Sequence, residues 1–167
     1  MALYNKGAVS ASKVRLNGYT IADDATVNFP EWTFQTYETK AMGTMTIPIP
    51  AFDDLELTMT KNGGFDLSGA VLNLGSNLLS VRWVQETHDK LGAFVPIPCN
   101  AELQVMPAGL PAQTVEVGTA SDEELKFKII RCAIFEAGKE KLIVDRKAGI
   151  LRVNGVDFML PRNAMLL

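Results

Sequence analysis

The segment that decides the fold class is Val14-Arg15-Leu16-Asn17-Gly18-Tyr19-Thr20-Ile21. Apolar and polar side chains alternate on both sides of Asn17-Gly18, which is the period of a β-strand with one buried face. Both central residues of a type I′ turn need a positive φ, and Asn followed by Gly tolerates this conformation best. The segment therefore predicts a tight β-hairpin.

The same alternation recurs along most of the chain. Runs with a period of two are bounded by Pro, Gly, Asn or Asp, and a second Asn-Gly turn lies at Asn154-Gly155. Many short strands separated by turns are typical of an antiparallel β-sandwich or barrel. Strands are predicted over residues 25–29, 31–39, 44–49, 55–60, 79–88, 93–97, 101–106, 114–117, 125–135, 141–145, 150–153 and 156–160.

One segment has the period of a helix instead. Four apolar residues are spaced i, i+3, i+4, i+7, which is the apolar stripe of an amphipathic helix. Asp66 or Ser68 is suited to cap the start of this helix, and Gly75 to end it. The prediction is a mainly β protein with about one flanking α-helix. The four residues are Leu67, Ala70, Val71 and Leu74.

Length and charge restrict the class of protein. The chain has 167 residues, which suits one domain over residues 1–167, and 47% of them are apolar, enough for a core. With 16 Lys+Arg against 19 Asp+Glu, the net charge of -3 argues against a protein that holds nucleic acid by its phosphates. Neither a signal peptide nor a membrane-spanning run is visible, so a soluble chain made in the cytoplasm, without a membrane partner, is expected.

Residues suited to catalysis or metal binding are few. The lone histidine, His88, is followed by Asp89, but adjacent strand residues point to opposite faces of a sheet. Cys99 and Cys132 are far apart and are expected to be buried thiols. The acidic run at residues 53–56 lacks the alternating ligands and glycine turn of a calcium loop. We therefore predict no catalytic residue, no cofactor and no metal site.

Residues 31–60 form the most informative region for function. The period of two predicts that one set of side chains packs in the core and that the other does not. This region has five acidic residues and only Lys40 as a basic one, a local net charge of -4, and few charges to protect a sheet edge. Such an edge suits strand addition to a neighbouring sheet, and the alternative is an ordinary sandwich whose polar face meets water. The predicted core set is Trp32, Phe34, Met45, Ile47, Leu55 and Leu57; the polar set is Thr33, Gln35, Thr44, Thr46, Glu56 and Thr58.

The order of motifs resembles the major tail tube protein of contractile-tailed bacteriophages, the family that includes the tubes of R-type pyocins. The resemblance covers roughly residues 13–64 and 125–163. Its motifs are Leu16-Asn17-Gly18, Thr36-Tyr37-Glu38-Thr39-Lys40-Ala41-Met42-Gly43, Thr46-Ile47-Pro48-Ile49, Asp53-Asp54-Leu55-Glu56-Leu57-Thr58-Met59-Thr60, Lys61-Asn62-Gly63-Gly64, Lys141-Leu142-Ile143-Val144-Asp145, Val153-Asn154-Gly155-Val156-Asp157 and Arg162-Asn163.

The resemblance implies a structural protein of the virion tail, without enzymatic activity. Subunits of this family form hexameric rings, and the rings stack into a hollow tube inside a contractile sheath. The implied partners are further copies of the chain, the sheath protein, the baseplate and the tape-measure protein, and DNA passes through the lumen without specific binding. We then expect the polar set to face the lumen, and Lys40-Ala41-Met42-Gly43 to reach into the adjacent ring.

Three alternatives remain open at this stage. The first is the tube of a headless bacteriocin-like particle, which has the same subunit chemistry. The second is a small β-sandwich that binds a carbohydrate or a lipid. The third is a small enzyme centred on His88 and Asp89.

Overall fold

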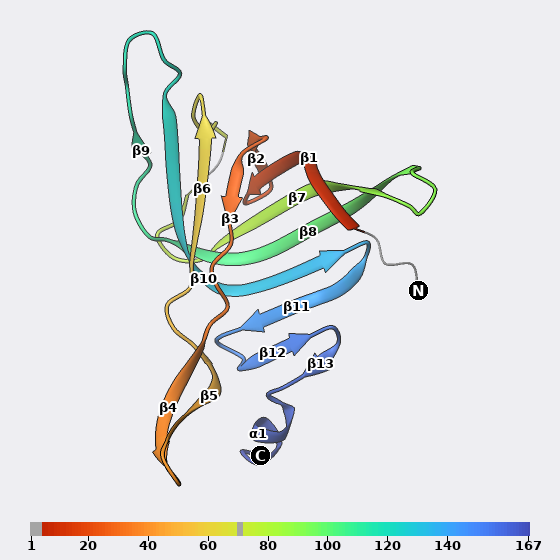
Figure 1. Ribbon diagram of the computed structural model, residues 1–167. Helices are drawn as coiled ribbons and strands as arrows, with labels where there is room; N and C mark the ends of the chain where they lie inside the picture. Colours follow the sequence, from red (N-terminus) through yellow and green to blue (C-terminus); the bar gives the residue numbers. More distant parts are fainter. Residues whose placement is uncertain (1–4, 70–71) are drawn as a thin grey trace.

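The computed structural model describes residues 5–69 and 72–167 and is built almost wholly of antiparallel strands (Figure 1). This confirms the predicted mainly β fold, although the sheets of the described residues do not close into a barrel. The elements are β1 (Asn5–Leu16), β2 (Tyr19–Asp23), β3 (Thr26–Asn28), β4 (Phe34–Lys40), β5 (Thr44–Phe52), β6 (Glu56–Asn62), β7 (Asn77–His88), β8 (Phe94–Pro107), β9 (Ala112–Gln113), β10 (Asp122–Glu136), β11 (Lys139–Asp145), β12 (Ile150–Val153), β13 (Val156–Asp157) and α1 (Leu160–Ala164).

Both Asn-Gly turns form as predicted. Asn17 and Gly18 join β1 to β2 with φ of 49° and 88°. Asn154 and Gly155 join β12 to β13 with φ of 49° and 85°. These positive values are the reason that the two residue types were informative, because most L-residues avoid this region.

Two layers share one long strand, β10. The larger layer has the strand order β13-β12-β11-β10-β8-β7-β1-β2, and a smaller layer is formed where β6 pairs with β3 and β10. The first part of β10, Asp122 to Lys128, pairs with β6, whereas the part from Phe127 onward pairs with β8. The register against β8 shifts between Ile129 and Arg131, and such a bulge lets a strand bend. Figure 1 shows β10 curving from one layer into the other.

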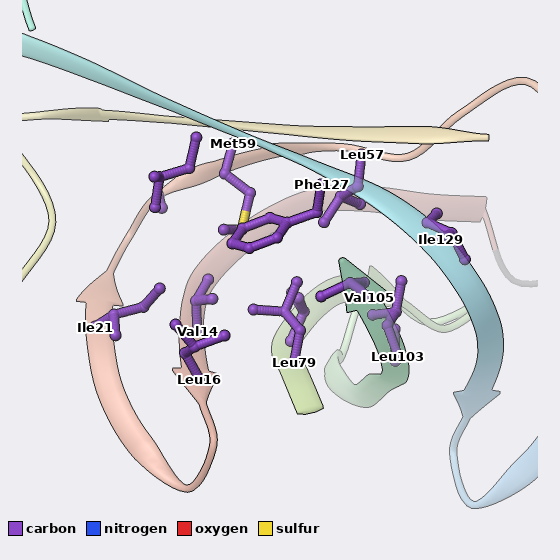
Figure 2. Close-up of a cluster of buried hydrophobic side chains, with 14 of the residues drawn as sticks. Val14, Leu16, Ile21, Leu57, Met59, Leu79, Leu103, Val105, Phe127 and Ile129 are labelled. Carbon is purple, nitrogen blue, oxygen red and sulfur yellow. The ribbon is translucent and has the colours of Figure 1, made fainter. Parts of the chain in front are cut away.

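The main core lies between these layers. Phe127, at the bend of β10, is 1% exposed, and Leu57 and Met59 of β6 lie beside it. Side chains of the larger layer face them from below in Figure 2. The alternation of buried and exposed residues on β6 follows the predicted period of two. The labelled side chains of the larger layer are Val14, Leu16, Ile21, Leu79, Leu103, Val105 and Ile129.

The predicted helix around residues 67–74 is wrong. Ala70 and Val71 lie outside the described residues, and the described neighbours 67–69 and 72–75 form turns and irregular chain. Asp66 accepts hydrogen bonds from both the backbone N–H and the hydroxyl of Ser68, a local turn that competes with a helix. Leu67 packs on the core but Leu74 is exposed, so the apolar spacing does not form one stripe.

In the C-terminal half, some observed strands begin or end at other residues than the sequence predicted. Residues 114–117, predicted as a strand, are irregular, and the short strand there is β9. The polar residues Asp122 to Glu124, expected in a loop, begin β10 because Glu123 pairs with both Lys61 and Gln113. The two strands predicted at 93–97 and 101–106 form one continuous strand, β8, which begins at Phe94. The short helix α1 follows β13, with a proline in its first turn, where a proline is well tolerated.

Asn77 is a buried polar residue that fixes the loop before β7. Its Oδ1 accepts hydrogen bonds from the Asn73 backbone N–H at 2.9 Å and the Asn17 side chain at 3.0 Å. Its Nδ2 donates to the Asn73 carbonyl at 2.7 Å. We expect Asn77→Ala to lower the free energy of unfolding by about 2–3 kcal/mol, because buried polar groups lose their partners. Urea denaturation measures this, and the exposed Asn28→Ala serves as a control within about 0.5 kcal/mol of the parent protein. Equal losses for the two variants would contradict this role of Asn77.

Candidate assembly surface

Strands β4 and β5 form a two-stranded sheet of their own, which we call the arm (residues 34–52). Within the described chain, its strands pair with each other and with no other strand. The arm projects from the body at the bottom of Figure 1. Its tip turns at Met42 and Gly43, with φ of 54° and 127°. The predicted break between two long strands is therefore confirmed as the tip of a hairpin.

Aromatic side chains hold the base of the arm. Trp32 and Phe52 lie edge to face with ring centroids 6.1 Å apart, and Phe34 stacks on Phe52 at 5.1 Å. Trp32 and Phe52 pack against the main core and also against a second cluster formed by Val144, Leu151 and Met159. The base of the arm is thus fixed to the body, while its outer part joins neither core cluster of the described chain.

The predicted core set of residues 31–60 is only partly buried. Leu55 and Leu57 are buried as predicted, and Trp32 and Ile47 are half-buried. The prediction is wrong for Phe34 and Met45, which are 41% and 51% exposed. The period of two is present, and on β5 it separates half-buried from exposed residues, but the arm lies outside the two-layer body, so neither of its faces is fully buried.

The predicted polar set divides between the arm region and the body. Thr33, Gln35, Thr44 and Thr46 are exposed on the arm or at its base. Glu56 and Thr58 are half-buried on β6, on the face opposite the core. Gln35 donates a hydrogen bond to Asp53 at 2.8 Å. Whether these side chains face a pore depends on neighbouring subunits and stays a prediction.

Lys128 partly compensates the negative charge of the acidic run at residues 53–56. Its Nζ lies 2.5 Å from a carboxylate oxygen of Asp54 and 2.8 Å from one of Glu56. Hydrogen bonds to Asp54 and then to Glu56 raise the pKa of Lys128 above its usual value. Lys128 is 74 residues along the chain from Asp54, so counting charges within residues 31–60 could not detect it. The local charge of this surface is therefore less negative than the sequence alone indicates.

A groove opens between the layers on the side of β1 and β3. It has a volume of about 570 Å³, and its apolar lining includes Val9, Phe29 and Trp83. Strand β2 pairs with β1 only from Lys13 onward, and β3 pairs with β6 alone within the described residues. Sequence patterns did not reveal this groove, because it results from where β2 stops along β1. Its open strand edges suit pairing with another chain.

The candidate catalytic and metal-binding residues have structural surroundings. Asp89 accepts hydrogen bonds at 2.8 Å from the backbone of Leu91 and of Ala93, so it organises the turn after β7. His88 packs edge-on against Phe94. In residues 5–69 and 72–167, no three His, Cys, Asp or Glu side chains gather as a metal site would require. The same ranges contain no helix with the length and apolar character to span a membrane.

Both cysteines are buried thiols, as predicted. Cys99 lies in β8 and Cys132 in the neighbouring strand β10. Burial raises the pKa of the Cys132 thiol to about 12. This thiol is therefore protonated near neutral pH and reacts slowly with thiol reagents.

In the described ranges the arm pairs with no strand of the body, and β1 has an open edge beyond β2. Both features are typical of a protein that assembles with further copies. The model of the family described as phage tail tube protein FII matches residues 8–165. The chain belongs to this tail tube family. The match confirms the resemblance and extends it over the central segment, residues 65–117, which the motifs left uncovered. Comparison with curated proteins finds no match.

Membership of the tail tube family decides between classes of function. The family is structural and non-enzymatic, which excludes the small enzyme centred on His88 and Asp89. A tail tube protein self-assembles within a virion tail, so surfaces that contact other copies replace a catalytic site as the functional feature. The arm and the groove both lie within the matched residues.

Proposed function

We propose that this protein is the structural subunit of the inner tube of a contractile phage tail. Residues 1–167 act as one tail-tube-like domain, and six copies form each ring of a stacked, hollow tube. The arm is the observation that carries this proposal, because its base is packed against the core while residues 34–52 pair with no strand of the body that the structure describes. The subunit also contacts the sheath protein, the baseplate and the tape-measure protein.

Within this proposal, the tip Lys40-Ala41-Met42-Gly43 contacts the adjacent ring. Met42 is fully exposed at the tip, and its flexible thioether adapts to irregular apolar surfaces. The open edges of β1 and β3 serve contacts within a ring.

The polar set lines the lumen, through which DNA passes without specific binding. Lys and Arg side chains on a pore wall would bind passing phosphates and slow the DNA. Lys128 pairs with β6 at Glu56 and therefore lies near the proposed wall. There Lys128 forms ion pairs with Asp54 and Glu56. Because these carboxylates compensate its positive charge, the pairing supports a wall that does not retain phosphate.

Tube growth from purified subunits is expected to begin after a lag that preformed tube ends abolish. Ordering the outer part of the arm on a partner costs on the order of 1 kcal/mol per residue, and a tube end already presents the complementary surface. Salt should shorten the lag, because it screens repulsion among Glu31, Glu38 and Asp53, whereas Lys128 compensates the neighbouring acids. Light scattering with negative-stain microscopy measures this, and lag-free growth at low salt and low concentration would contradict it.

The same microscopy separates the alternatives. Rods or rings support the tube subunit. Dispersed monomers at every concentration would favour a β-sandwich that binds a small carbohydrate or lipid in the groove beside Phe29 and Trp83. A headless bacteriocin-like particle uses the same subunit, and the presence or absence of packaged DNA in particles purified from the producing cell distinguishes it from a phage.

A further inference from the structure

A second projection lies at the end of the molecule opposite the arm. It is the segment between β8 and β10, residues 108–121, which we call the upper loop. Figure 1 shows the upper loop at the top and the tip of the arm at the bottom. Its apolar side chains Leu110, Val115 and Val117 are among the most exposed in the described chain. The sequence patterns had indicated only a loop and a short strand here.

The upper loop resembles the arm in having a fixed base and a free tip. At its base, Ala112 and Gln113 of β9 pair with Glu124 and Glu123 of β10. The Gln113 side chain donates to the Ser121 hydroxyl at 3.1 Å. Beyond this base, Val115 and Val117 contribute to no core cluster of the described residues. The tip therefore presents an exposed apolar surface beyond a paired base.

Both projections extend from the same small layer in opposite directions. The arm is continuous with β6 through residues 53–55, and the upper loop is continuous with β10. Strands β6 and β10 pair in regular register from Glu56–Lys128 to Asn62–Asp122. The paired strands therefore set the direction of one projection relative to the other.

The two tips are complementary in charge. Lys40 is the one charged residue of the arm tip, residues 40–43, and Glu116 is the sole charged residue within residues 108–121. Glu38, the other charged residue of the arm, lies on β4 before the tip. Both side chains are exposed. The apolar surface beside Lys40 consists of Met42 and Met45, so each tip combines one charge with exposed apolar side chains. Two arms facing each other would instead place Lys40 against Lys40.

We infer that the upper loop is the receptor for the arm tip of a second copy in the next ring. Lys40 pairs with Glu116 across this contact, and Met42 lies against Val115 and Val117. Two complementary surfaces at opposite ends of one molecule make a head-to-tail contact, which extends without closing. The inference rests on the proposed tube function, and it identifies which part of the neighbouring subunit receives the arm.

Charge reversal tests the pairing. Lys40→Glu and Glu116→Lys are each expected to raise about tenfold the protein concentration needed for tube growth, because like charges then meet at the contact. The double variant is expected to restore growth at the parent concentration. Lys90→Glu, an identical charge change in the turn after β7, serves as the matched control and should leave growth unchanged. A double variant that grows no better than either single variant would overturn the inference.

Cross-linking tests the contact independently of its energy. Met42→Cys and Val117→Cys are made in separate chains, mixed, assembled into tubes and treated with a short bismaleimide. A cross-linked pair containing one of each chain is expected in tubes and not in free subunits. The native thiols are buried and give a low background. Leu91→Cys, also fully accessible, replaces Val117→Cys in the control mixture and should not link to Met42→Cys.

The outcomes separate this inference from the proposed function. Tubes that form while Met42→Cys and Val117→Cys remain unlinked would overturn the receptor assignment and leave the tube function standing. Failure of the parent protein to form tubes, even on preformed tube ends, would overturn the proposed function and with it this inference. Linked pairs in tubes, together with rescue by the double charge reversal, would support both.

Discussion

Phe127→Ala is expected to lower the free energy of unfolding by about 3–5 kcal/mol, because it removes a large buried side chain and leaves a cavity. Phe127 is 1% exposed and belongs to the part of β10 that pairs with both β6 and β8. The cavity would open where the two layers meet, and neither layer can collapse into it without bending β10. Denaturation in guanidinium, followed by circular dichroism, measures the loss.

Phe158 provides the matched control for Phe127. It is 57% exposed, so Phe158→Ala removes the same atoms with little loss of packing and should change the free energy of unfolding by less than about 1 kcal/mol. Similar losses for the two variants would show that Phe127 is not central to the core. A Phe127→Ala protein that is unfolded at ambient temperature should also fail to form tubes.

Removing the tip of the arm is expected to abolish tube growth while leaving the fold intact. One variant deletes Lys40-Ala41-Met42-Gly43. A second replaces residues 40–44 by Asn-Gly. Thr39 and Met45 already pair with each other, so the new two-residue turn connects them directly. The tip contributes to neither core cluster, so unfolding should shift by less than about 0.5 kcal/mol. Sedimentation and negative-stain microscopy measure assembly.

A change at another turn controls for general effects of shortening or altering a surface hairpin. Replacing Lys90-Leu91 by Asn-Gly alters the exposed turn after β7 and should leave folding and tube growth unchanged. Rods of normal length from either arm variant would show that the tip is not an inter-ring contact. Loss of folding in both arm variants would show that the arm stabilises the body, contrary to its lack of strand partners there.

Features that depend on neighbours in the sequence were predictable from the sequence. Asn17-Gly18 and Asn154-Gly155 form turns, because positive φ is a property of the residues themselves. The alternation along β6 correctly placed Leu57 in the core, since the pleat of a strand sets which side chains share a face. The order of such motifs was also sufficient to suggest the tail tube family, which the family match over residues 8–165 confirms.

Features that depend on distant pairing were decided only by the tertiary structure. Phe34 and Met45 have the period of core residues, yet they are exposed because β4 and β5 leave the two-layer body. Lys128 reaches the acidic run from β10, and Asp66 forms a local turn with Ser68 where the start of a helix was expected. A local pattern determines which side chains of a strand lie together on one face. Whether another layer covers that face depends on how the strands pair, as the bend of β10 between two layers illustrates.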